Sequence, residues 1–205
     1  MSRGLVLVGV GLIALAAVLS LTVPWAGPAV GWPDFWGSSP ATPVTLEAAA
    51  ELVRRVLAEW GYPDLVPKEV MEFTNHFYVL VVEKDTGRGA MELLVERNGF
   101  VHPEPGPNMM WNTKYGHVGG RMGPGFGTWQ GTPPLSMERA RGVAREFVDR
   151  VFPGAVPGPG TEFYGYFTFD LQRDGDTFGM LSVNAYTGQV WYHAWHGAFI
   201  REKEL

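Results

Sequence analysis

The hydrophobic positions of this chain recur with helical spacing in two segments, and each segment is followed by stretches with strand spacing. Thr45 and Ser136 are typical N-cap residues, and each is followed two positions later by a glutamate, which favours the positive end of a helix. Five apolar residues after each cap fall on one helix face: Leu46, Ala49, Ala50, Val53 and Leu57, then Met137, Ala140, Ala144, Phe147 and Val151. The pattern predicts two amphipathic helices that begin at equivalent points of two similar segments.

Behind the second helix, Leu181, Val183 and Ala185 alternate with Ser182 and Asn184, which is the pattern of a half-buried strand, and turn residues divide both segments into further strands. The predicted strands are 70–73, 77–84, 90–96 and 100–102 in the first segment and 162–171, 177–184 and 189–193 in the second. Glu72-Phe73 recurs as Glu162-Phe163 about ninety residues later, and Gly99 recurs as Gly188 at nearly the same offset. The sequence therefore predicts an α+β fold in which a helix plus an antiparallel meander of three or four strands occurs twice in tandem.

The second segment ends in the hairpin Tyr186-Thr-Gly-Gln-Val190, and with its helix and strands it resembles the PepSY domain family. The resemblance covers 45–102 and 136–196. The first segment departs from it, because Arg97-Asn-Gly-Phe-Val101 lacks the threonine. The resemblance implies an extracytoplasmic, non-catalytic binding or inhibitory module, and it carries over no catalytic residues.

The N-terminal region predicts the location of the protein. Gly4–Val23 contains no charged residue and would span about 30 Å as a helix, which matches the hydrocarbon thickness of a bilayer. Arg3 precedes this stretch, and no Lys or Arg follows it until Arg54, so the N-terminus is predicted to lie in the cytoplasm. Tryptophans typical of the headgroup level follow at once. We expect an uncleaved single-pass anchor, with a cleaved signal peptide as the alternative.

Composition and motifs exclude several functions. The formal net charge of −5 argues against a nucleic-acid partner, and the absence of cysteine removes disulfides, thiolate metal sites and thiol nucleophiles. The chain has neither Gly-x-Ser-x-Gly nor His-Glu-x-x-His, and Gly123–Gly127 lacks the context of a phosphate loop. The sequence thus predicts no catalytic residues and a protein that is not an enzyme.

The segment 103–134 belongs to neither repeat and is rich in Gly, Pro, Met and aromatic residues. Large apolar side chains on an irregular segment either fold back on the sheets or form a landing site for a partner protein. The candidates for partner binding are Met109, Met110, Trp111 and Tyr115.

A metal site in the same region is the alternative. Thioether and imidazole ligands suit Cu(I), although their spacing here matches no known motif and packing is the simpler explanation. The candidate ligands are His102, Met109, Met110, His117 and Met122. His193 and His196 would point to opposite faces if the last strand continued, so we expect them to be structural or exposed at an edge.

These patterns divide the chain into a cytoplasmic stub, a membrane helix, a tether, the first repeat, the insert, the second repeat and a tail: 1–3, 4–23, 24–44, 45–102, 103–134, 135–197 and 198–205. The function they favour is a membrane-anchored, extracytoplasmic module that docks on a partner protein and needs no cofactor. One alternative is an exported copper-handling accessory protein for a membrane redox system. A second is a PepSY protein that inhibits a protease.

Overall fold

The structure is a computed structural model, and it describes residues 44–116 and 132–205, which belong to one compact unit. The predicted membrane segment 4–23, together with His117, Met122 and Gly123–Gly127, lies outside the described residues. Within the two described ranges, no helix is long and apolar enough to cross a membrane.

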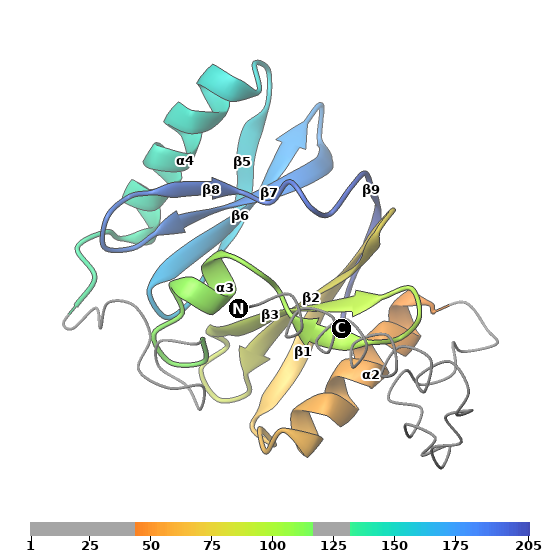
Figure 1. Ribbon diagram of the computed structural model, residues 1–205. Coiled ribbons are helices and arrows are strands. Elements are labelled where there is room, and N and C mark those ends of the chain that lie inside the picture. Colours follow the sequence, from red (N-terminus) through yellow and green to blue (C-terminus); the bar gives the residue numbers. More distant parts are fainter. Residues whose placement is uncertain (1–43, 117–131) are drawn as a thin grey trace, which may run out of the picture. The chain divides into compact units, whose positions relative to one another are not determined.

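The N-terminal half is a helix followed by four antiparallel strands (Figure 1). The Thr45 hydroxyl accepts a hydrogen bond from the Ala48 backbone N–H at 3.2 Å, which caps the helix as the sequence predicts. The elements are α2 (Leu46–Glu59), β1 (Leu65–Phe73), β2 (His76–Glu83), β3 (Gly89–Glu96) and β4 (Val101–Pro103).

The C-terminal half repeats this order with a second capped helix and its own sheet. Its elements are α4 (Met137–Val151), β5 (Val156–Glu162), β6 (Tyr166–Arg173), β7 (Asp176–Asn184) and β8 (Val190–Tyr192). The single strand predicted over 162–171 is wrong, because the chain reverses at Gly165, which has a φ of +100°. A Cβ at Gly165 would lie 2.4 Å from the backbone oxygen of Trp111, so only glycine fits this turn.

The C-terminal residues form a strand of the first sheet rather than a tail. Strand β9 (Phe199–Glu204) pairs antiparallel with β1, so the sheet order is β4-β3-β2-β1-β9, and the second sheet has the order β5-β6-β7-β8. The predicted separation of a tail 198–205 from the repeats is therefore wrong. One apolar pair followed by charged residues gives no strand period, and it is pairing with β1 that makes this segment extended.

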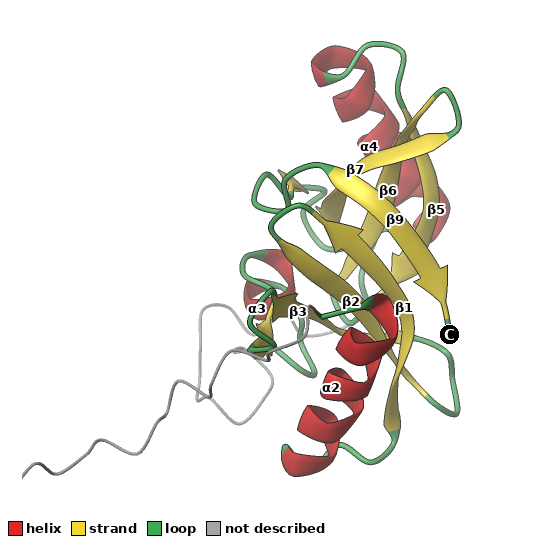
Figure 2. Cartoon of the chain, turned by 90° about the vertical axis from the view of Figure 1, so that its right-hand side faces the viewer, coloured by secondary structure: helices red, strands yellow, loops and turns green. Residues whose placement is uncertain are grey.

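Three apolar clusters hold the layers together. Alternate residues of β2, such as Phe77 and Val79, pack under α2, whereas Tyr78 and Leu80 point to the opposite face. There they share a cluster with Phe163 and other residues of the second half. The outer face of the second sheet packs against α4 (Figure 2). The fold is thus α+β, with two antiparallel sheets whose inner faces meet and whose outer faces each carry a helix.

The segment after β4 folds back on the sheets, which confirms one of the two expectations for it. Its short helix α3 (Pro107–Met110) precedes Trp111, which lies in the cluster between the sheets. The Asn112 side chain donates to the Ala90 backbone oxygen at 2.7 Å. This segment therefore forms part of the wall of the interior that the two sheets enclose.

Candidate metal centre between the two sheets

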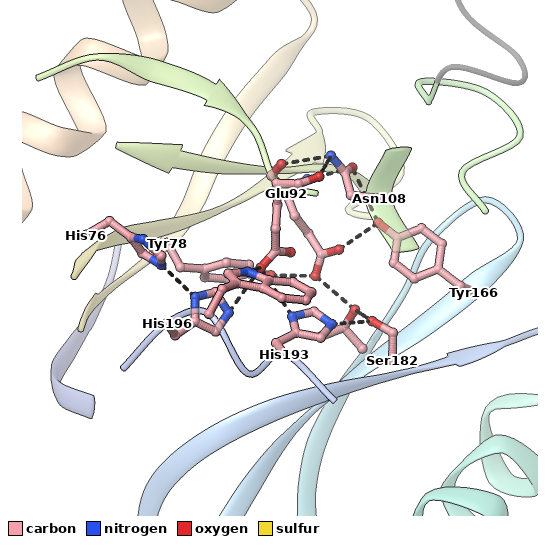
Figure 3. Close-up of polar contacts among 11 residues, drawn as sticks. His76, Tyr78, Glu92, Asn108, Tyr166, Ser182, His193 and His196 are labelled. Carbon is pink, nitrogen blue, oxygen red and sulfur yellow. Dashed lines mark hydrogen bonds and ion pairs between the residues drawn. The ribbon is translucent and has the colours of Figure 1, made fainter. Parts of the chain in front are cut away.

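The interior between the two sheets contains ionisable side chains as well as apolar ones. Glu92 of β3 and Glu104, which follows β4, are both fully buried. His193 and His196 are buried beside them, although they belong to the segment that leaves β8 (Figure 3). Buried charges are costly unless they are paired, hydrogen-bonded or bound to a metal, so this group is the main candidate for a functional site.

The backbone places these side chains through the ends of short strands. The backbone N–H of Glu104 donates to the backbone oxygen of Glu92 at 2.9 Å. The backbone N–H of His193 donates to the backbone oxygen of Met180 at 3.0 Å. The chain then turns around His196, and the Asn75 side chain donates to the Trp195 backbone oxygen at 2.9 Å. The turn between β1 and β2 thus holds the segment that contains His193 and His196 against the first half.

Three potential ligand atoms converge at this point. Glu104 Oε1 lies 3.2 Å from His193 Nδ1 and 3.0 Å from His196 Nε2, and one ligand atom from each residue lies within 4.8 Å of the others. Two atoms that each lie about 2.0 to 2.1 Å from a tetrahedral ion are about 3.3 to 3.4 Å apart. The two separations between the carboxylate and the imidazoles are therefore close to those of a metal-ligand set.

Both histidine ligand atoms, and the second oxygen of Glu104, lack a hydrogen bond of regular geometry. Glu104 Oε2, His193 Nδ1 and His196 Nε2 are buried and have no hydrogen-bond partner within the described ranges. A buried polar atom without a partner is rare and costs free energy of folding. The imidazole nitrogens and the carboxylate thus lie close together without a hydrogen bond of regular geometry, and a shared ion would satisfy all of them.

The opposite side of each ligand is firmly held. His193 Nε2 lies 3.0 Å from Ser182 Oγ, and His196 Nδ1 lies 2.8 Å from His76 Nε2 (Figure 3). The Trp195 indole N–H donates to Glu104 Oε1 at 3.1 Å. Metal-binding histidines characteristically engage their second nitrogen in this way, which orients the ring and leaves the first nitrogen free for the ion.

The electrostatics of the site are those of coupled buried charges. Burial by itself would raise the pKa of Glu104. The charge of His193, together with the close contacts that His193 and His196 make with the carboxylate, outweighs burial and holds that pKa far below its usual range. Burial alone would lower the pKa of His193, but the negative charge of Glu104 outweighs burial and raises that pKa. Burial, followed by the charge of His196, lowers the pKa of His76 to about 4 and keeps that ring neutral. Glu104 thus stays anionic, as a metal ligand must.

Glu92 has a different role, because both of its oxygens already have donors. It accepts hydrogen bonds from Tyr78 at 2.9 Å, Tyr166 at 2.8 Å and Thr168 at 2.9 Å. Burial, followed by the charge of Glu104, raises its pKa to about 7. Glu92 therefore ties β2, β3 and β6 together beside the ligand set and is not one of its members.

Ser182, His193 and Glu104 also contact one another in the sequence of a catalytic triad, in which a hydroxyl touches an imidazole and the imidazole touches a carboxylate. However, Ser182 is fully buried in the middle of β7, and its oxygen also lies 2.8 Å from the Thr168 hydroxyl. A nucleophile must reach the substrate carbon, and the buried Ser182 oxygen lacks such access. The arrangement consequently favours ion binding over acyl transfer.

The residues predicted from sequence for partner binding are dispersed between core and surface. Trp111 is only 6% exposed and packs edge-to-face on Trp191, which places it in the core, and its role as a docking contact stays a prediction. Tyr115 is half-buried and donates to Glu83 at 2.7 Å. Met109 is half-buried and Met110 is 51% exposed, which leaves Met110 as the most accessible of the four.

The Met- and His-rich set predicted for copper includes two residues outside the described ranges, His117 and Met122, and stays a prediction. His102 lies 2.9 Å from Glu96 Oε1 and 2.9 Å from the Pro103 oxygen, so both of its ring nitrogens are engaged. The expectation that His193 and His196 diverge is wrong, because β8 ends at Tyr192 and the chain then turns. The close spacing of His193 and His196 was the available signal of a metal site in the sequence. The third potential ligand, Glu104, is distant in sequence, so the spacing could not reveal it.

Comparisons with known proteins leave the family open. No protein-family model matches the chain, and no curated protein matches it. A solved structure, the Bacillus megaterium YpeB C-terminal domain, is similar at 12% sequence identity with a TM-score of 0.28. The match covers 73% of this chain and 62% of that one, so this chain spans less than two thirds of its length. A similarity of this degree assigns neither family nor function.

Proposed function

We propose that this protein binds one divalent transition-metal ion through Glu104, His193 and His196. The observation that supports the proposal is the convergence of one buried carboxylate and two buried imidazoles, in which His193 Nδ1, His196 Nε2 and Glu104 Oε2 have no hydrogen-bond partner among the described residues. The ion would neutralise the carboxylate and give both imidazoles a partner, which removes the cost of leaving them unsatisfied.

The donor set favours Zn²⁺. Two imidazole nitrogens and one carboxylate oxygen suit zinc and its neighbours, whereas Ca²⁺ and Mg²⁺ require oxygen ligands. Iron(II) oxygenases use the same donors, but they leave positions open to oxygen and substrate. Here the ligand side chains are at most 2% exposed, which favours an ion held for structure or storage over one used in catalysis.

The cellular setting follows from the sequence and belongs to the same proposal. The uncleaved anchor would place the two halves outside the cytoplasm, and the order of helix and meander in each half is compatible with a PepSY-like unit. The protein would then be a non-catalytic, metal-binding accessory protein at the membrane surface. This function retains the exported metal-handling class predicted from sequence but uses different ligands and a different ion. Docking on a partner protein stays a prediction within this setting.

The test is metal binding by the purified full-length chain. We expect isothermal titration calorimetry to give one equivalent of Zn²⁺, and Co²⁺ to give the visible absorption of a four-coordinate ion. At a free zinc concentration of about 100 times Kd, the free energy of unfolding would rise by about 2.7 kcal/mol. For a domain of this size, that corresponds to an increase in Tm of about 5 to 11 °C.

Matched histidine variants locate the ion. His193→Ala and His196→Ala should abolish binding, whereas His102→Ala, which changes a histidine bonded elsewhere, should retain it. Melting of the metal-free variants shows whether each one is folded. Zinc binding that survives both ligand substitutions in folded protein would contradict the proposal, as would no binding by the wild type. Labelling of Ser182 by a fluorophosphonate would instead favour the hydrolase arrangement.

A further inference from the structure

Strand β9 is held on the first sheet by few side-chain contacts. Within β9 only Phe199 is half-buried, and the remaining residues of the strand are exposed. The Phe199 ring packs edge-to-face on that of Phe73, with 5.7 Å between the ring centroids. Of the two ion pairs that β9 makes within the described residues, Lys203 with Glu47 at 2.6 Å is exposed and contributes little to stability. Arg201 with Glu72 at 2.8 Å joins an exposed arginine to a carboxylate that is 12% exposed. Backbone pairing with β1 thus supplies most of the attachment.

Charge repulsion opposes the same attachment. Glu69 of β1 pairs with Glu204 in the strand register, and Glu202 lies two residues away on β9. Burial, followed by the charges of Glu202 and Glu204, raises the pKa of Glu69 to about 7. Near neutral pH, part of the β1–β9 contact therefore brings like charges together, and the strand needs another restraint.

The segment that leads into β9 carries two of the three ligands. His193 and His196 lie between β8 and β9, whereas Glu104 belongs to the first half. The chain passes from His196 to β9 through Gly197, whose φ is +83°. Beside it, the Ala198 N–H donates to the Thr74 hydroxyl at 3.1 Å, and the Thr74 N–H donates to the Ala198 oxygen at 2.9 Å. An ion at this site would therefore fix the point from which β9 starts.

We propose that metal binding controls the attachment of β9, so that the loaded site keeps the strand on β1 and loss of the ion releases it. This inference rests on the proposed metal site. Release leaves the edge of β1 open to an extended peptide that has the pattern of β9. Such a peptide presents an aromatic residue to Phe73 and cations to Glu72 and Glu47, which are the contacts that β9 itself makes.

The experiment compares the full-length chain with saturating Zn²⁺ and after EDTA treatment. Hydrogen exchange of residues 199–204 is the first readout, because released backbone amides exchange with solvent. Binding of a labelled synthetic peptide of residues 197–205, followed by fluorescence anisotropy, is the second. We expect at least tenfold faster exchange in β9 after metal removal, little change in β2 and β3, and peptide binding only to the metal-free chain.

Lys203→Ala is the matched control, because it removes an exposed ion pair of β9 that is remote from the ligands. It should change exchange in β9 only slightly, and by the same factor in both metal states, while leaving zinc affinity within twofold. Zinc binding with unchanged exchange in β9 would overturn this inference and leave the proposed function intact. Absence of zinc binding would instead refute the proposed function. Peptide binding that is equal in the two metal states would contradict the opening of the β1 edge.

Discussion

Replacing Trp111 separates a core residue from a docking residue. Trp111 lies between the sheets, 6% exposed, with its ring centroid 5.9 Å from that of Trp191. Its side chain shares a cluster with Phe163 of the second half. Trp111→Ala would therefore open a cavity where the two halves meet, in addition to removing apolar contact area.

The expected loss is large relative to the stability of a domain. Truncating a buried tryptophan to alanine costs about 3 to 5 kcal/mol. In a domain of this size each kcal/mol changes Tm by about 2 to 4 °C, so Trp111→Ala should lower Tm by about 6 to 20 °C. Thermal unfolding of the full-length chain, followed by circular dichroism, measures this loss directly.

Met110→Ala is the neighbouring control. Met110 is 51% exposed on α3, and surface substitutions of this kind usually change the free energy of unfolding by no more than about 0.5 kcal/mol. Equal melting of the two variants and the wild type would refute the placement of Trp111 in the core. A Trp111→Ala protein that melts normally but loses a membrane partner would support the docking role predicted from sequence.

Three further substitutions test other parts of the interior. Glu92→Ala removes an acceptor from three buried hydroxyls, and a hydroxyl left without a partner costs about 1 to 3 kcal/mol, so urea unfolding should show a larger loss than for Glu92→Gln, and equal losses would contradict the network. Burial, followed by the charges of Glu202 and Glu204, raises the pKa of Glu69 from 4.5 to about 7. The contribution of Glu69 to the free energy of unfolding is therefore complete below pH 4.5 and is lost as the pH rises through 7. Glu69→Gln should remove that part of the pH dependence in urea titrations between pH 4.5 and 7, and an unchanged slope would refute it. Gly197→Ala should reduce zinc affinity, because its Cβ would meet Thr74 Oγ1, whereas Gly154→Ala, with a similar positive φ in open space, should not.

Much of the layer structure could be predicted locally. Thr45 and Ser136 cap the two helices as their side chains predict, and the apolar alternation in β7 and the turn residues that bound β2 and β3 match the observed strands. These features depend on residues within one or two turns of each other, so the amino-acid sequence contains the relevant information. The prediction failed at Gly165, where a turn lies inside an apolar run, and at β9, where no strand period exists.

The candidate site shows the opposite dependence. His193 and His196 are near each other in sequence, but Glu104 is about ninety residues away, and nothing in the spacing indicates that they meet. Trp111 has the composition of a docking residue, and only the packing of the second sheet shows that it is buried. The sequence by itself determined the helices and most strands, because these follow from short-range periodicity. The tertiary structure alone decided which ionisable groups share the interior, because their contacts require two sheets to meet face to face.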